Sequence, residues 1–407
     1  MFVRTETKME NRRIEQAVIL AGGLGTRMAP FTEHNPKPMY EINGKPFLEY
    51  LIGQIKSFGI KDILLLLGYL PQKIIEYFGD GKTFDVNITY SITPVEFETG
   101  ARLRNAKDKL NDKFLLMYCD NYCPINFKKL QKDYFDNDAD IQITAYANKD
   151  GYTKSNLLID ATNKVTCYDK KRTIQGLQGV DIGYAIVKKE LLQLLPDGNC
   201  NFEQEVYPLV VKNQKMFASI TEHRYYSIGS WERIELTKQF FSQKKTIFLD
   251  RDGTLNIRPQ KACYVTKPEE FIWIDGAREA VAELKKAGYQ IFLISNQPGI
   301  ARGCLTEFDL HCIDEKMQNE LREIGGKIDG IYYCPHNWDE DCDCRKPKPG
   351  LFYQAQKEHS LNLTLCIMIG DDKRDMQAAK EAGCKGIHVD DNYTLRRAVE
   401  DILRSEK

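Results

Sequence analysis

The chain contains, just past its middle, the stretch Phe248-Leu-Asp250-Arg-Asp252-Gly-Thr254-Leu-Asn256. The short apolar run that ends at Leu249 predicts a buried strand, because it is rich in β-forming residues and stops at polar ones. Ligands in open α/β sheets bind outside the carboxyl ends of strands, so Asp250 and Asp252 are expected to point into a site. One carboxylate can act as a nucleophile and the other as an acid/base, while Gly253 lets the chain turn away. An acidic turn without chemistry has the same pattern.

Length and composition predict two globular domains. The chain has 407 residues, of which 42% are apolar and 28% charged, and its net charge is −1. No overall field therefore favours nucleic acid or a membrane surface as a partner. The longest apolar runs, such as residues 63–67, are too short to span a bilayer. Because no apolar signal region precedes Arg13, the twelve cysteines are expected to be reduced in the cytoplasm.

The order of predicted elements indicates how the domains are divided. Residues 1–12 are expected to form a flexible tail, residues 13–241 a first domain, residues 242–245 a polar linker and residues 246–407 a second domain. Strand and helix patterns alternate in both domains, which predicts the α/β class with parallel, doubly wound sheets.

A glycine-rich turn follows the strand predicted for residues 16–21. It is Gly22-Gly-Leu-Gly25-Thr-Arg27-Met-Ala-Pro30-Phe-Thr32, and Pro36-Lys37-Pro38-Met39 comes soon after. Glycines let backbone N–H groups approach phosphate oxygens, so a strand, turn and helix of this kind can form a phosphate cradle. The run resembles the signature GGxGTRxxPxT…PKPM of the sugar-1-phosphate nucleotidyltransferases. The resemblance implies a Rossmann-like domain of the GT-A type.

The resemblance also implies roles for individual residues. Attack of a sugar phosphate on a nucleoside triphosphate builds negative charge, and Arg27 and Lys37 are the cations expected to stabilise it. Asp120, at the end of the strand predicted for residues 114–119, corresponds to the family's Mg²⁺-binding aspartate, although a solvated acid at a strand end has the same pattern. The turn around the triphosphate is implied to comprise Gly22, Gly23 and Gly25. Other substrate contacts are implied for Thr99, Gly100, Lys170 and Glu203.

The first domain departs from the family pattern at Ser227-Ile-Gly229-Ser-Trp231. The family has D-I-G-x-P here, and its aspartate is the second metal ligand. Serine is a poor Mg²⁺ ligand beside a carboxylate. Either another group completes the coordination sphere, or the transferase activity is weakened. A domain that only binds sugar nucleotides is the alternative.

Three further polar motifs follow predicted strands of the second domain. They are Ser295-Asn296-Gln297, Arg345-Lys346-Pro-Lys-Pro-Gly350 and Asp371-Asp372-Lys-Arg-Asp375. Together with the stretch at Asp250, they resemble the four motifs of the haloacid-dehalogenase (HAD) phosphatases. The run Asn-Gln-Pro-Gly-Ile-Ala-Arg-Gly at residues 296–303 resembles the heptose-bisphosphate phosphatases within that superfamily.

The resemblance implies a phosphomonoesterase that works through an aspartyl-phosphate. Asp250 is expected to attack phosphorus, and Asp252 to protonate the leaving sugar oxygen and later activate water. Ser295 is expected to hydrogen-bond the phosphoryl group, and Lys346 to neutralise it. Mg²⁺ is expected on Asp250, Asp252 and Asp371, since a divalent ion brings a carboxylate against a phosphate dianion. Substrate contacts are implied for Thr254, Asn296, Arg302 and Arg345.

A second metal is predicted from thiols and an imidazole. The ligands expected are Cys334, His336, Cys342 and Cys344, in the arrangement C-x-H…C-x-C. Three thiols and a histidine suit a closed tetrahedral zinc site that shapes a loop and does no chemistry. A disulfide among the cysteines is the alternative.

The joining of the two domains suggests one pathway. The chain resembles a D-glycero-D-manno-heptose 1,7-bisphosphate 7-phosphatase fused to a heptose 1-phosphate guanylyltransferase, which would supply activated heptose for surface polysaccharides. Its partners would then be sugar phosphates and a nucleoside triphosphate, with guanine implied only by the pathway. A histidinol-phosphatase-like enzyme, joined to a non-catalytic or differently specific first domain, is the alternative.

Overall fold

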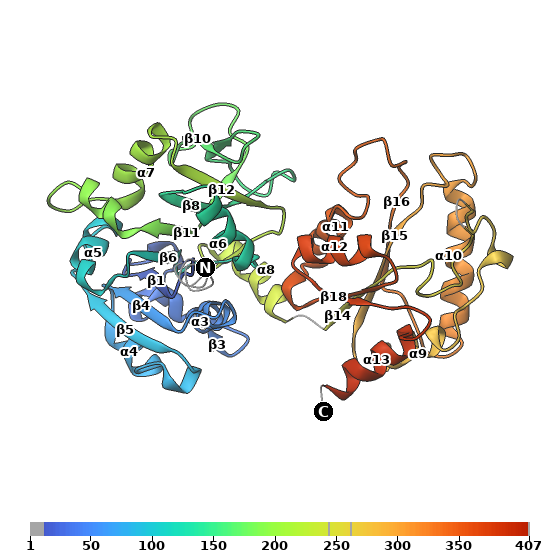
Figure 1. Ribbon diagram of the computed structural model, residues 1–407. Helices are drawn as coiled ribbons and strands as arrows, with labels where there is room; N and C mark the ends of the chain where they lie inside the picture. The colour runs from blue at the N-terminus through green and yellow to red at the C-terminus, as the bar shows by residue number, and fades with distance from the viewer. Residues whose placement is uncertain (1–11, 243–244, 261–262, 406–407) are drawn as a thin grey trace, which may run out of the picture. The chain divides into compact units, whose positions relative to one another are not determined.

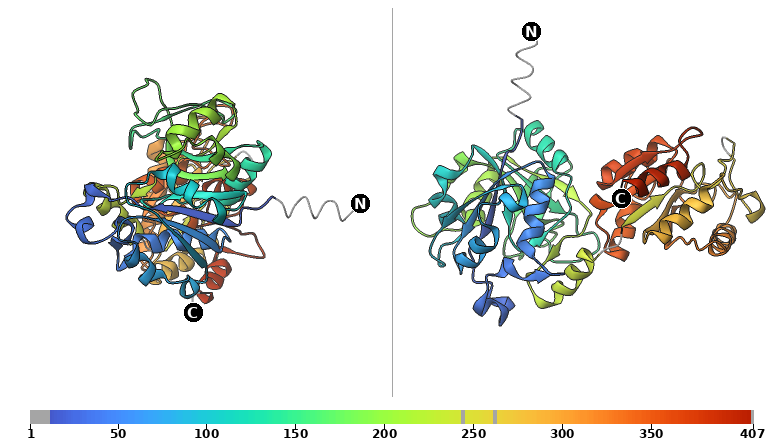
Figure 2. Two further views of the ribbon diagram at one scale, coloured as in Figure 1. Left: turned by 90° about the vertical axis from the view of Figure 1, so that its left-hand side faces the viewer. Right: turned by 90° about the horizontal axis from the view of Figure 1, so that it is seen from below.

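The computed structural model describes residues 12–242, 245–260 and 263–405. It consists of two compact units, residues 1–241 and 242–407, and Figures 1 and 2 show helices on both faces of a central sheet in each. Nearly all of the predicted tail and the middle of the predicted linker lie outside the described residues. Within the described ranges, no helix is long and apolar enough to cross a membrane.

The first unit is built on a seven-stranded sheet in the order β12-β8-β11-β6-β1-β4-β5. The strands are β1 (Gln16–Ala21), β4 (Asp62–Leu67), β5 (Asn87–Ile92), β6 (Lys113–Tyr118), β8 (Ile141–Tyr146), β11 (Val180–Lys188) and β12 (Met216–Thr221). The main helices are α3 (Phe47–Ser57), α4 (Pro71–Phe78), α5 (Thr99–Asn105), α6 (Phe127–Asp136), α7 (Phe202–Lys212) and α8 (Trp231–Phe241). Short pairs are formed by β2 (Glu41–Ile42) with β3 (Lys45–Pro46), β7 (Asn121–Tyr122) with β13 (Tyr226–Ser227), and β9 (Leu157–Ile159) with β10 (Val165–Tyr168).

One strand differs from the predicted parallel sheet. β11 runs antiparallel to both of its neighbours, β6 and β8, while the other pairs in the sheet are parallel. A parallel pair needs a long crossover, usually a helix. Between β8 and β11 the chain forms only the β9–β10 hairpin, so it returns beside β8 in the opposite direction.

The second unit has a five-stranded, fully parallel sheet in the order β16-β15-β14-β17-β18. The strands are β14 (Thr246–Leu249), β15 (Gln290–Asn296), β16 (Gly330–Cys334), β17 (Ile367–Gly370) and β18 (Lys385–His388). The helices are α9 (Ala277–Lys286), α10 (Glu307–Arg322), α11 (Gly350–His359), α12 (Lys373–Ala382) and α13 (Leu395–Arg404).

Alternate residues of β14 enter two different cores. Ile247 and Leu249 pack in one cluster with residues of α9, α10 and α13, while Phe248 packs in another with residues of α11 and α12. A strand covered on both faces needs a continuous apolar run rather than an alternating one. This explains why the strand is recognisable from its sequence.

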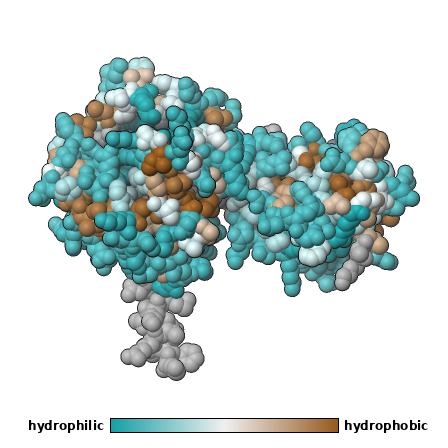
Figure 3. Space-filling model, turned by 90° about the horizontal axis from the view of Figure 1, so that it is seen from above, coloured by the Kyte–Doolittle hydropathy of each residue, from teal (hydrophilic) through white to brown (hydrophobic). Residues whose placement is uncertain are grey.

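The strand order places a site at the carboxyl ends of two inner strands in each sheet. In the first unit β1 lies beside β6, and in the second β14 lies beside β17. Each pair consists of the first and fourth sheet strands along its unit, where the direction of winding reverses, and ligands bind at the carboxyl ends of such a pair. Gly22 and Asp120 follow the first pair, and Asp250 and Asp371 follow the second. The surface seen in Figure 3 is predominantly hydrophilic on both units, with scattered apolar patches.

Candidate active sites and metal centre

Asp250 is held at the centre of the second unit's site. Its backbone N–H donates to the carbonyl of Ile369, at 3.0 Å, which ties the end of β14 to β17. The residue is only 7% exposed. Burial raises the pKa of Asp250 to about 7, against the lowering effect of Lys346. A partly desolvated carboxylate directly beside a cation suits a nucleophile that must meet an anionic phosphate.

Lys346 joins two acids of the site. Its buried Nζ lies 2.7 Å from Asp250 Oδ1 and 2.6 Å from Asp375 Oδ1, and it donates to the carbonyl of Ile294 at 2.8 Å. Burial alone would lower the pKa of Lys346, but the two carboxylates outweigh it and raise the pKa. The lysine therefore stays charged in the interior.

Three carboxylates form a group that could hold a metal ion. Oxygen atoms of Asp250, Asp371 and Asp375 all lie within 4.8 Å of one another, and carboxylate oxygens are the ligands that Mg²⁺ prefers. The carboxylate of Asp252, also predicted as a ligand, does not belong to this group. Asp375 does belong to it, although only Asp371 of this acidic loop was predicted as a ligand. Asp372 instead caps α12 and bonds Arg374.

The turn after Asp250 brings the backbone against the fourth motif, at Asp371. Gly253 has φ of 96°, and a Cβ there would lie 1.9 Å from Asp371 Oδ2. Both the left-handed conformation and the close approach require glycine.

Asp252 is surrounded by hydrogen-bond donors. Its Oδ1 accepts from Asn256 Nδ2 at 3.0 Å and from Arg251 Nε at 3.2 Å. Its Oδ2 accepts from Gln297 Nε2 at 3.0 Å and from Arg251 Nη2 at 3.1 Å. Burial acts to raise the pKa of Asp252, but these donors outweigh it and lower the pKa below the ordinary value. The group is therefore ionised in the absence of substrate, and the approach of a phosphate dianion would raise the pKa of Asp252 toward that of a proton donor.

The predicted residues of the second motif have different surroundings. Ser295 is 2% exposed, and its Oγ accepts from Gln297 Nε2 at 2.8 Å. Asn296, predicted to contact substrate, exchanges two hydrogen bonds of 3.0 Å with the backbone of Lys346. Its side chain thus holds Lys346 in place.

Thr254 is buried, and its hydroxyl has no partner among the described residues.

The two predicted arginines lie on loops beside these motifs. Arg302 donates from Nη1 to the hydroxyl of Tyr264 at 2.5 Å and from Nε to Asn337 at 3.0 Å. Arg345 donates from Nη1 to the carbonyl of His336 at 3.2 Å. A further arginine, Arg258, pairs with Asp371 at 2.9 Å and was not predicted.

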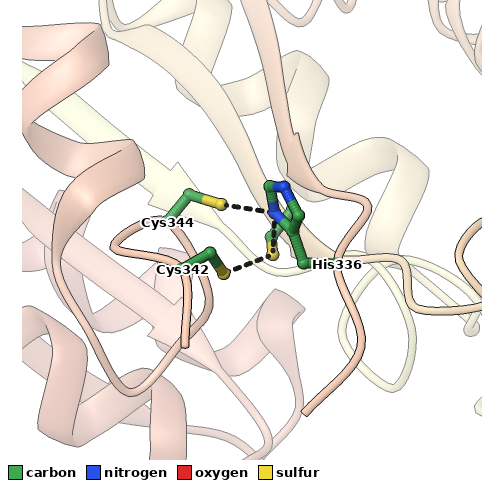
Figure 4. A group of neighbouring side chains, drawn as sticks. His336, Cys342 and Cys344 are labelled. Atoms are coloured by element: carbon green, nitrogen blue, oxygen red, sulfur yellow. Dashed lines mark hydrogen bonds between the residues drawn. The ribbon is translucent and has the colours of Figure 1, made fainter. Parts of the chain in front are cut away.

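The predicted thiol and imidazole ligands converge, as Figure 4 shows for His336, Cys342 and Cys344. Cys334 Sγ lies 3.6 Å from Cys342 Sγ and 3.5 Å from His336 Nδ1, and His336 Nδ1 lies 3.2 Å from Cys344 Sγ. Tetrahedral zinc with ordinary bond lengths would separate two sulfurs by about 3.8 Å, and a sulfur and a nitrogen by about 3.6 Å. The observed separations lie within about 0.4 Å of that geometry, and the three cysteines are not joined in disulfides.

The backbone of this cysteine–histidine loop is bonded to the phosphatase motifs. The carbonyl of Cys334 accepts from Gln297 N at 2.8 Å, and that of Pro335 accepts from Ala301 N at 3.2 Å. The next carbonyl, on His336, is the one that accepts from Arg345. Three successive carbonyls therefore position elements of the active site.

The first unit brings its predicted catalytic residues together. Lys37 Nζ lies 2.7 Å from Asp120 Oδ2. Gly25 has φ of 66°, and a Cβ there would lie 2.9 Å from Lys37 Cβ, so the glycine turn packs directly on the lysine. Arg27 lies near Gly229, since a Cβ added to Gly229 would lie 4.0 Å from Arg27 Nη2.

Ser227 lies beside Asp120. The short strands β13 and β7 pair Ser227 with Asn121, and Ile228 N donates to the carbonyl of Asp120 at 3.1 Å. The Ser227 hydroxyl accepts from Gly229 N at 2.9 Å. Among the described residues, no group of three metal ligands includes Asp120.

The remaining predicted contacts of the first unit meet around residues 200–203. Thr99 Oγ1 accepts from Phe202 N at 2.9 Å, and Gly100 N donates to the carbonyl of Cys200 at 2.9 Å. Lys170 Nζ lies 2.8 Å from Glu203 Oε2.

Arg102 is a residue of this site that was not predicted from the sequence. It is 3% exposed and donates to the carbonyls of Gly22 at 3.0 Å and Leu67 at 2.8 Å. A Cβ on Gly22 would lie 2.3 Å from its guanidinium carbon. The guanidinium of Arg102 therefore packs against the glycine turn and holds its backbone by a hydrogen bond. The sequence of the helix that contains Arg102 does not indicate this role.

Comparison with known proteins relates each unit to a different family. The model of the nucleotidyl transferase family matches residues 16–163, and that of haloacid dehalogenase-like hydrolases matches residues 205–383. The 7-phosphatase of D-glycero-beta-D-manno-heptose-1,7-bisphosphate from Photorhabdus laumondii is 48% identical over 140 residues, 33% of this chain and 73% of that protein. The protein of the same name from Pasteurella multocida is 47% identical over 148 residues, 35% of this chain and 79% of that protein.

Two solved structures are also similar. One is D,D-heptose 1,7-bisphosphate phosphatase from B. bronchiseptica with magnesium and phosphate, 32% identical over 40% of this chain and 99% of that one, with a TM-score of 0.38. The other is HddC from Yersinia pseudotuberculosis with GMP-PN, 28% identical over 56% of this chain and 100% of that one, with a TM-score of 0.48.

The molecule is thus an enzyme that joins a nucleotidyltransferase domain to a hydrolase domain of the HAD type. Through its second unit, the chain belongs to the family of the D-glycero-β-D-manno-heptose-1,7-bisphosphate 7-phosphatases. The predicted α/β class and both family resemblances are confirmed.

Proposed function

We propose that the second unit removes the 7-phosphate of D-glycero-D-manno-heptose 1,7-bisphosphate and that the first unit joins the heptose 1-phosphate to a nucleotide, with GTP as donor. The buried contact between Asp250 and Lys346, at 2.7 Å, is the observation that carries the phosphatase half. The names of the relatives favour a heptose bisphosphate over histidinol phosphate. The Asp120–Lys37 pair under the glycine turn supports the transferase half.

The proposed hydrolysis has two steps. A carboxylate oxygen of Asp250 attacks phosphorus, the bond from phosphorus to the sugar oxygen breaks, and Asp252 gives that oxygen a proton. Asp252 then takes a proton from the water that cleaves the aspartyl-phosphate. Lys346 holds the attacking carboxylate and balances the charge of the phosphoryl group. Mg²⁺ held by Asp250, Asp371 and Asp375 would offset the repulsion between carboxylate and phosphate.

Product analysis tests both halves together. The protein is incubated with the bisphosphate, Mg²⁺ and one nucleoside triphosphate per tube. We expect one phosphate released per sugar in every tube and a nucleotide-linked heptose with GTP alone. An intact bisphosphate would overturn the phosphatase half, and phosphate release without any sugar nucleotide would overturn the transferase half.

Zinc is proposed as the ion of the cysteine–histidine loop. Changing Cys344→Ser should remove the bound zinc and lower phosphatase kcat/KM by about 10- to 100-fold, the usual effect of disturbing groups that orient a site. The reason is that the loop carbonyls hold Gln297, Ala301 and Arg345. Metal analysis and kinetics measure both changes, with the exposed Cys304→Ser as control. Full activity in zinc-free protein would refute the proposal.

Ser227 offers a test of metal binding in the first unit. Ser227→Asp places a second carboxylate beside Asp120, and we expect the Mg²⁺ concentration for half-maximal transferase activity to fall about tenfold, equivalent to about 1.4 kcal/mol. Titration of pyrophosphate release with Mg²⁺ measures the change. Ser230→Asp, which adds the same charge further along the loop, should leave the midpoint unchanged. Equal midpoints in Ser227→Asp and the natural chain would show that position 227 does not face the metal.

A further inference from the structure

Gln297 connects the acid/base of the phosphatase to its phosphoryl-binding hydroxyl. The residue follows β15 and is 2% exposed. Its Nε2 donates both to Asp252 Oδ2, at 3.0 Å, and to Ser295 Oγ, at 2.8 Å. Its Oε1 accepts from Arg251 Nη2 at 3.1 Å. All of its polar side-chain atoms are therefore used within the site.

The orientation of this amide is determined by its neighbours. A guanidinium can only donate, so the amide oxygen must face Arg251. The amide nitrogen must then face Asp252 and Ser295, as the distances show. Arg251 is itself buried, 1% exposed, so neither group can turn into solvent.

This arrangement also determines which way the Ser295 hydroxyl acts. A hydroxyl has one hydrogen to donate and two lone pairs that accept. Gln297 occupies a lone pair of Ser295 Oγ, and among the described residues the hydroxyl hydrogen has no acceptor. The hydrogen is thus available to an anionic oxygen, which is what a phosphoryl group supplies.

The backbone of Gln297 fixes the position of its side chain. Its N–H donates to the carbonyl of Cys334 at 2.8 Å, the last residue of β16 and one of the four clustered ligands. The amide is therefore anchored at its base to a neighbouring strand and at its tip to Asp252 and Ser295.

We propose that Gln297 is a positioning residue for the phosphatase reaction. It presents Asp252 to the leaving oxygen and Ser295 to the phosphoryl group at a fixed separation, so that one bound phosphate meets both. This inference rests on the proposed phosphatase function. Because the residue acts through two groups that matter most during bond breaking, its loss should lower kcat more than it raises KM.

Two variants separate positioning from packing. Gln297→Met keeps the length and volume of the side chain but loses every side-chain hydrogen bond. Gln297→Glu keeps the acceptor for Arg251 but loses the donors to Asp252 and Ser295. Both should lower kcat by about 100-fold with KM changed less than about threefold, and both should weaken inhibition by inorganic phosphate about tenfold. A role in packing alone would predict normal kinetics in Gln297→Met, which keeps the volume of the side chain and adds no charge beside Asp252.

The full-length protein is assayed on heptose 1,7-bisphosphate and on p-nitrophenyl phosphate, with thermal unfolding measured in parallel. Gln356→Met, the same change at a buried glutamine of α11, should keep normal kcat. If the natural chain hydrolyses neither ester, the proposed function fails. If it hydrolyses either ester and the Gln297 variants match its kcat and phosphate inhibition, the inference about Gln297 is overturned.

Discussion

Replacing Asp250 with asparagine is expected to lower phosphatase kcat by at least about 10⁴-fold, the scale on which loss of a nucleophile acts. The amide lacks the negative charge needed to attack phosphorus. It keeps the shape of the aspartate, and its oxygen can still accept from Lys346, which lies 2.7 Å from Asp250 Oδ1 in the natural chain. The folded structure should therefore persist, and the loss should lie in chemistry.

Phosphate release and mass spectrometry measure this effect. In acid-quenched natural protein, the peptide containing Asp250 should carry one phosphoryl group, and in Asp250→Asn it should carry none. Nucleotidyl transfer by the first unit should be unchanged, which controls for folding of the chain. Asp391→Asn, at an exposed position, should behave as the natural chain. Substantial phosphatase activity in Asp250→Asn would identify another nucleophile.

Replacing Lys346 with methionine should destabilise the second unit by about 3–5 kcal/mol in the absence of Mg²⁺, because removing one partner leaves buried charge uncompensated. Lys346 contacts Asp250 and Asp375 at 2.7 and 2.6 Å, and both acids are almost fully buried. Mg²⁺ should restore part of the lost stability, since an ion between the carboxylates replaces the missing charge. Phosphatase activity should be lost with or without Mg²⁺.

Calorimetry of the two variants Lys346→Met and Lys348→Met provides the measurement. Lys348 pairs with the exposed Asp341 at 2.6 Å, and exposed ion pairs contribute at most about 1 kcal/mol. Loss of this ion pair in Lys348→Met should change the unfolding temperature of the second unit only slightly. Equal shifts in both variants, or an Mg²⁺-independent shift in Lys346→Met, would contradict the role assigned to Lys346.

The sheets could be predicted from sequence because their strands are local and buried on both faces. Residues 246–249 form β14 as the apolar run indicates. The direction of β11 could not be predicted in the same way, because it depends on the absence of a crossover helix before it. Strand existence is a local property, whereas strand direction is set by the connection.

The motif residues of both sites were predicted, but several of their contacts were not. The side chain of Asn296, which was expected to contact substrate, hydrogen-bonds the backbone of Lys346, fifty residues further along the chain. Arg251 lies in the sequence between two acids that are proposed to be catalytic, where a charged residue is expected to be exposed, yet its side chain is buried. Contacts of this kind depend on which distant side chains the sheet brings together, and a motif does not contain that information.

The approach of Gly253 to Asp371 has a consequence for the comparison of genes. Any single-base change in a glycine codon that replaces glycine with another amino acid adds a side chain. At position 253, the Cβ of that side chain would collide with the Asp371 carboxylate. A descendant that lost this glycine could not keep the acid in the same place. The two positions should therefore be retained or lost together, and this pair offers a marker for telling working hydrolase domains from copies that survive only as scaffolds.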